Sequence, residues 1–118
     1  MDEMIGAGHK LEKIIESTSH LRQVRKAELQ FGDMVLIKTR NSLYSISVLE
    51  SDYYLVSGGW FDRKGLSPTK ASISGCTWGG SIIKVDTLAA CGLRLEFGNR
   101  VLTTPIQKVF VVHGSGKN

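Results

Sequence analysis

From residue 31 to residue 112 the chain is a series of short apolar segments separated by turn residues, and this pattern limits what it can fold into. Turn residues recur roughly every 8–12 positions, which is typical of a small antiparallel barrel or sandwich. The segments expected to be strands are residues 34–39, 43–49, 53–56, 70–74, 82–85, 93–97, 101–104 and 108–112. We therefore expect a mainly β fold, a partly open antiparallel barrel of about six or seven strands over residues 31–112.

Two turns are indicated by residue type. Gly98-Asn99 separates two alternating segments and predicts a two-residue hairpin turn in which the glycine has a positive φ. Asn41-Ser42 marks a second turn after residue 39. Pro105 is expected at an edge or a corner, because proline cannot donate a hydrogen bond to a central strand.

Residues 9–29 show a different period, with apolar side chains at steps of three, four and seven. They are Leu11, Ile14, Ile15, Leu21, Val24 and Leu29. This spacing predicts an amphipathic helix, which can bend at Ser17-Thr18-Ser19 because hydroxyl side chains compete for backbone hydrogen bonds. Such a stripe must be buried on the barrel or on another chain. A small barrel seldom covers so long a helix, so we expect self-association as a dimer, through this helix or a barrel edge.

The length of 118 residues fits a single domain, with residues 113–118 expected to form a flexible tail. The net charge is +4, and residues 31–118 carry the whole excess. That charge is compatible with a polyanionic partner and is also common without one. The sequence has no apolar run of the roughly 18–20 residues that a membrane span needs. The N-terminus does not resemble a secretory signal, so we expect a cytoplasmic protein without a membrane partner.

Residues 75–81, GCTWGGS, are the most unusual segment. Gly75 and Gly80 have the spacing of a phosphate-binding loop, but Ser81 stands where that loop needs lysine and a strand is expected next, so this interpretation fails. The segment is better explained as a tight connection between strands. In that case Trp78 would cover the end of the barrel.

Cys76 would need a nearby base to act as a nucleophile. The three histidines are His9, His20 and His113, and nothing in the sequence brings one of them to the cysteine. Cys76 and Cys91 are therefore expected to be reduced structural thiols. The cysteines and histidines have no metal-chelating spacing and no carboxylate pair stands out, so we expect no metal, no cofactor and no enzymatic activity.

Basic residues beside aromatic ones are the remaining functional signal, because single-stranded nucleic acids bind to such surfaces. The residues concerned are Lys38, Arg40, Arg63, Lys64 and Lys70, with Tyr44, Tyr53, Tyr54, Trp60 and Trp78. The alternative is that the aromatic side chains form the core. The candidate ligand-binding residues are Arg40, Asn41, Trp60, Arg63, Lys64 and Trp78.

A resemblance covers residues 33–48 and 75–112. The segments KTRNSLY, GCTWGGS and LEFGNRVLTTPIQKVFV resemble a family of small bacterial β-barrel proteins of unknown function, with a Thr-Arg-Asn-Ser turn and a closing Arg-Val-x-Thr-x-Pro hairpin. The resemblance implies an SH3-like barrel and carries no activity, cofactor or binding residue with it.

These observations favour a non-enzymatic binding or assembly module. Two alternatives stay open, an RNA- or single-stranded nucleic-acid-binding barrel and a small thiol enzyme centred on Cys76.

Overall fold

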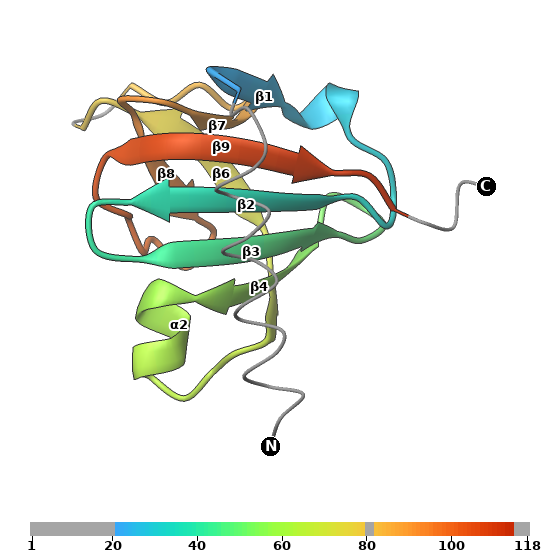
Figure 1. The fold of residues 1–118 in the computed structure, drawn as a ribbon, viewed down its shortest axis with the longest axis horizontal. Coiled ribbons are helices and arrows are strands. Elements are labelled where there is room, and N and C mark those ends of the chain that lie inside the picture. The colour runs from blue at the N-terminus through green and yellow to red at the C-terminus, as the bar shows by residue number, and fades with distance from the viewer. Residues whose placement is uncertain (1–20, 80–81, 115–118) are drawn as a thin grey trace.

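The structure is a computed structural model that describes residues 21–79 and 82–114 (Figure 1). The strands in these ranges are β1 (Gln23–Arg25), β2 (Met34–Thr39), β3 (Leu43–Val48), β4 (Tyr54–Gly58), β5 (Thr69–Ala71), β6 (Ile73–Thr77), β7 (Thr87–Ala90), β8 (Arg94–Phe97) and β9 (Ile106–Val112). A 3₁₀ helix, η1 (Lys26–Glu28), follows β1, and a short α-helix, α2 (Gly59–Arg63), follows β4. The described residues contain no helix long and apolar enough to cross a membrane.

The strands form two layers. One layer is a five-stranded antiparallel sheet in the order β5-β4-β3-β2-β9; the pair β6-β8 lies behind it, and the pair β1-β7 lies at its β9 side (Figure 1). The mainly β antiparallel fold is thus confirmed. The sheet does not close into a barrel, because β5 and β9 are its two edges and do not pair with each other; two antiparallel layers take the place of the partly open barrel that was expected. The other strands form separate pairs, β1-β7 and β6-β8, and do not join the edges of the large sheet.

The core fills the space between the layers. Alternate residues of the large sheet point into it, such as Val35 and Ile37 of β2, and both are fully buried. Leu88 of β7 and Leu95 of β8 meet them from the second layer and are also fully buried. The period-two pattern of the sequence therefore corresponds to one apolar inner face.

The helix predicted over residues 9–29 is wrong where it can be checked, and residues 9–20 lie outside the described residues. Residues 23–25 form a strand in which Val24 is buried between exposed neighbours, and β1 pairs with β7. Leu21 forms a bridge with Val109 of β9. The edges of β7 and β9 offer backbone hydrogen bonds to an extended segment that a helix could not make. Residues 21–25 therefore pair with these edges, although the apolar spacing of the sequence is helical.

Three of the predicted strands also differ from the structure. The segment 70–74 divides at Ser72 into β5, which pairs with β4, and β6, which pairs with β8. The chain thus changes sheets within a single apolar run. Segments 82–85 and 101–104 each make only an isolated bridge, at Lys84 and Leu102. β1, β7 and α2 were not predicted.

Both turns lie where they were expected. Thr39 N donates to Ser42 O at 2.9 Å across the β2–β3 hairpin. At the second turn the positive φ, 70°, belongs to Arg100 and not to Gly98, so that part of the prediction is wrong. Arg100 N donates to Phe97 O, which makes a three-residue loop ending in a left-handed residue. Gly98 has another role, because a Cβ there would overlap the Ser72 side chain.

The C-terminal end of the described region is held by Asp33, which is buried. Its carboxylate accepts hydrogen bonds from Gln30 N at 2.9 Å and from Gly114 N at 3.1 Å. His113 Nδ1 lies 3.5 Å from the same carboxylate. Of the tail expected at 113–118, these two residues are described and the rest are not. Pro105 is exposed and immediately precedes β9, at the corner that was expected.

Candidate functional site

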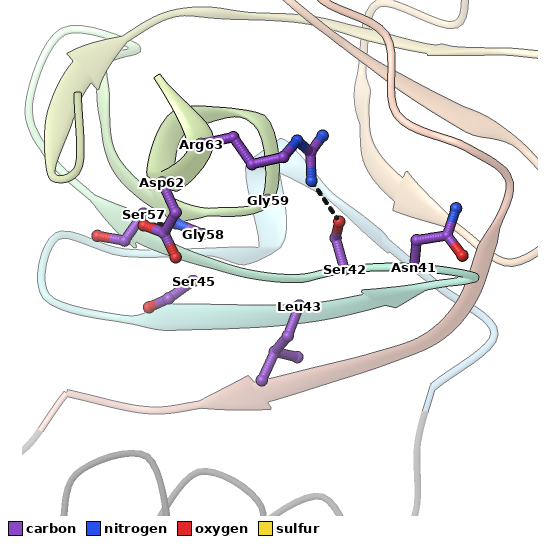
Figure 2. Close-up of a pocket in the computed structure, with 9 residues that line it drawn as sticks. All are labelled: Asn41, Ser42, Leu43, Ser45, Ser57, Gly58, Gly59, Asp62 and Arg63. Carbon is purple, nitrogen blue, oxygen red and sulfur yellow. Dashed lines mark hydrogen bonds between the residues drawn. The ribbon is translucent and has the colours of Figure 1, made fainter. Parts of the chain in front are cut away.

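A polar cleft opens between the β2–β3 hairpin and α2, with a volume of about 490 Å³ (Figure 2). Its lining residues are Asn41, Ser42, Leu43, Ser45, Ser57, Gly58, Gly59, Asp62 and Arg63. Six of these nine carry a polar side chain. A ligand bound here would therefore meet hydroxyl, amide and charged groups as well as apolar surface.

An aromatic cluster fixes α2 at one wall of the cleft. Phe61 is buried and packs edge-on against Phe97 at 4.8 Å and Trp60 at 5.1 Å between ring centroids. Trp60 N also donates to the Tyr44 hydroxyl at 3.3 Å. A five-residue helix is unstable alone, so this packing is what holds it. Because Phe61 points inward, the next two residues point outward to the cleft.

Two glycines leave the base of the cleft without side chains. Gly58 has a φ of 102°, and a Cβ on it would overlap the carbonyl oxygen of Leu43. Gly59 has a φ of 47°, and a Cβ on it would overlap the Tyr44 ring. Both positions therefore require glycine for conformation and for space. Because β4 approaches β3 closely at these glycines, α2, which follows β4, lies next to the β2–β3 hairpin.

Charges of opposite sign occupy the two sides of the cleft (Figure 2). Asp62 Oδ1 accepts a hydrogen bond from Gly58 N at 3.1 Å, which orients the carboxylate near Ser45 and Ser57. Arg63 extends to the other side, where its Nη1 donates to Ser42 Oγ at 3.4 Å. That bond is long and exposed, so a ligand oxygen can replace it at little cost.

The serines come from the outer face of the sheet, opposite to the core. Ser45 of β3 pairs in register with Ser57 of β4, so the two serines are neighbours on this face, and the Ser45 hydroxyl donates to Met34 Sδ at 3.2 Å. Both are half-buried and line the cleft. A hydroxyl can donate or accept, so this side of the cleft adapts to either kind of ligand group.

The structure brings two of the six candidate ligand residues into the cleft, Asn41 and Arg63. Arg40 and Lys64 are their sequence neighbours and are exposed, but neither lines the cleft. Trp60 is half-buried and packs against the core.

The sixth candidate, Trp78, is not part of this group. It follows β6 and does not line the cleft. Its side chain is 67% exposed, so the expectation that it covers one end of a barrel is wrong. The Lys84 ammonium lies 5.7 Å from the ring centroid. The ring faces outward because the chain turns immediately after Thr77, whose hydroxyl accepts a hydrogen bond from Gly79 N.

Most of the other aromatic side chains are not available for stacking. Tyr44 and Tyr54 belong to the core cluster and are buried. Burial, together with the negative charge of Asp52, raises the pKa of Tyr54. Tyr53 is exposed, with the Lys70 ammonium 4.7 Å from its ring centroid. The aromatic residues thus serve mainly as core, as the alternative interpretation held.

Cys76 lies within the core and not at a surface site. Its Sγ donates to Leu88 O at 3.4 Å, and burial raises its pKa to about 11. A thiol with that pKa is protonated at neutral pH, whereas a nucleophilic cysteine needs to be a thiolate. Cys91 is half-buried, and both cysteines are free. Within the described ranges, no three His, Cys, Asp or Glu side chains group as metal ligands.

Most residues of the cleft were not predicted from the sequence. Ser45 and Ser57 carry a weak signal, because each is a hydroxyl on a strand whose neighbouring residues are apolar. Only the register of β3 against β4 shows that these two residues are neighbours. Asp62 could be noticed as the residue next to Arg63, but its direction depends on the helix that was not predicted.

Comparisons of the chain with protein-family models, with curated proteins and with solved structures gave no significant match.

Proposed function

We propose that the protein is a non-enzymatic binding module, and that the cleft between the β2–β3 hairpin and α2 holds a small ligand by an anionic group. The observation that carries this proposal is the Arg63 side chain. It reaches into a cleft lined by hydroxyls, where its hydrogen bond to Ser42 is long and readily exchanged.

The ligand group that fits Arg63 is a carboxylate or a phosphate. A guanidinium offers paired N–H donors that match two oxygens of such a group, and these charge-assisted bonds are stronger than the bond to a neutral serine. Asn41 and Ser42 supply further donors on the same side. On the other side, Asp62 favours a ligand cation or hydroxyl. A small molecule with an anionic and a donor group would therefore span the cleft.

The proposal can be tested by titrating inorganic phosphate, and separately acetate, into the isotopically labelled protein at constant ionic strength. We expect amide signals of Ser42, Gly58 and Gly59 to shift in nuclear magnetic resonance spectra, with saturation. In Arg63→Gln we expect the affinity to fall at least tenfold, because an amide cannot supply the charge or the paired donors.

Arg22→Gln is the matched control, because Arg22 is an exposed arginine beside β1 and does not line the cleft. It should bind the anions as the unsubstituted chain does. Equal loss of binding in both variants would attribute the effect to net charge and not to the cleft. Unsaturable shifts spread over the surface would contradict the proposed site.

A single-stranded nucleic acid is the second candidate, favoured by the exposed basic residues that adjoin the cleft. Arg40 precedes Asn41 and Lys64 follows Arg63, so a phosphate backbone could contact basic residues on both walls. A mixed-sequence oligonucleotide then binds more tightly than inorganic phosphate, and its affinity falls steeply with salt. The absence of any mobility shift at low salt, with phosphate binding retained, would remove this candidate and leave the first.

A further inference from the structure

The outer face of the large sheet carries an apolar patch at its β9–β2 side. Four residues form it, Met34 and Leu36 of β2 and Phe110 and Val112 of β9, with Met34 paired to Val112 and Leu36 to Phe110. They alternate with Val35, Ile37 and Val109, which point into the core. The patch therefore faces away from the second layer, toward the viewer of Figure 1.

Leu36 and Phe110 are nonetheless buried, at 0% and 1% exposure, and neither belongs to the core cluster. An uncovered sheet face normally carries polar side chains that alternate with apolar ones, and β3 does so with Ser45 and Ser47. β2 and β9 carry apolar residues on both faces instead, which is the pattern of strands covered on both sides. Because this burial exists within a single chain, the cover belongs to this chain.

We infer that this patch is the docking surface for residues 9–16 of the same chain, bound through the stripe Leu11, Ile14 and Ile15. The sequence left two destinations open for that stripe, this chain or another one. The burial of Leu36 and Phe110 favours the first.

The path of the chain fits this placement. The described region begins at Leu21, whose N–H donates to Val109 O at 2.7 Å on the free edge of β9. Residues 17–20 can span up to roughly 14 Å when extended, enough to turn round that edge. Eight residues of helix are about 12 Å long, and the width of the sheet from β9 across β2 to β3 is roughly 10 Å. A helix over residues 9–16 is therefore long enough to cross the patch.

Charge complementarity supports the same arrangement. On a helix, Glu12 lies at one border of the apolar stripe, next to Ile15, whereas Glu16 lies nearly opposite to the stripe. Lys38 and Lys108 are partners in register at one border of the patch. The Glu12 carboxylate can thus face these two ammonium groups while the stripe covers Leu36 and Phe110.

The test uses the full chain and the oxidation of Met34 by hydrogen peroxide, followed by mass spectrometry. Leu11→Asp combined with Ile14→Asp should release the segment and speed the oxidation of Met34 several-fold. Lys13→Asp is the matched control, since it makes a similar charge change on the face opposite to the stripe and should leave the rate unchanged. Equal rates in all three proteins, or equal acceleration in both variants, would overturn the inference.

A second measurement needs no substitution and covers the case in which the double variant fails to fold. An amine-reactive cross-linker should join Lys10 or Lys13 to Lys38 and Lys108 in preference to the exposed Lys64 and Lys84. Links of equal frequency to all four lysines would contradict docking. A mixture of light and heavy isotope-labelled chains distinguishes the occupants: links within one chain support the inference, and mixed links would assign the patch to a second copy.

Discussion

The two halves of the large sheet share one inner face but differ on the outer one. The β9–β2 half carries Leu36 and Phe110 there, both buried, whereas the β3–β4 half carries Ser45 and Ser57, which line the cleft. These four residues form one continuous row across the sheet. A single row of side chains is thus apolar and packed at one end and polar and open to the cleft at the other.

The largest expected effect is at the backbone of the β3–β4 half. Gly58→Val places a Cβ against the carbonyl of Leu43 at a φ of 102°, so we expect a loss of about 3 kcal/mol or more in the free energy of unfolding. Gly65→Ala is the control, since Gly65 has a φ of 69° and open space around it. It should cost only about 1 kcal/mol. Chemical denaturation measures both, and a stable Gly58→Val would show that β4 does not need this close approach.

Leu36 and Ser45 are partners in the same row, and the loss of their side chains should differ in its effect on stability. Leu36→Ala should cost about 2–5 kcal/mol, because it leaves a cavity under the outer face. Ser45→Ala should change stability by less than about 0.5 kcal/mol. Urea denaturation of both variants gives the difference. Similar values for the two would contradict the division of the sheet into a packed half and a half that lines the cleft.

Alkaline pH should lower the stability of the fold through Cys76 of β6, which is buried in the core between the two layers. Burial raises the pKa of Cys76 from 9.0 to about 11, so the folded state holds the proton more tightly than the unfolded state. This contribution, about 2–3 kcal/mol, is present below pH 9 and is lost as the pH rises to about 11. Cys76→Ala should remove that part of the pH dependence when unfolding is followed by circular dichroism. An unchanged pH profile would mean that other groups cause the loss.

The smallest expected effect lies within the cleft. Asp62→Asn keeps an oxygen that can accept from Gly58 N and removes a negative charge, so stability should change by less than about 1 kcal/mol. Phosphate affinity should rise a few-fold, because one repulsive charge is gone. Titration against the unsubstituted chain measures it. Weaker phosphate binding in this variant would indicate that Asp62 orders the cleft instead of opposing the anion.

Local signals accounted for the β2–β3 hairpin, where the expected strands 34–39 and 43–49 match β2 and β3 to within one residue. They failed where the structure of a segment depends on which strand it pairs with. Nothing in the run around Ser72 shows that the chain leaves one sheet for another. α2 was missed because five residues have little helix propensity of their own, and burial of Phe61 stabilises them. Asn41 and Arg63 were found as candidates, and the serines between them were not.

The sequence by itself determined that this chain is mainly β, since turn residues and apolar alternation act within a few positions of each other. It also showed the Met34–Ile37 apolar run, whose two-sided burial became apparent only in the sheet. The tertiary structure alone decided that residues 23–25 pair as a strand, that the sheet stays open, and that Ser45, Ser57 and Arg63 meet in one cleft. Those outcomes depend on hydrogen bonds and packing between residues far apart in the chain, and such contacts leave no periodic trace in the sequence.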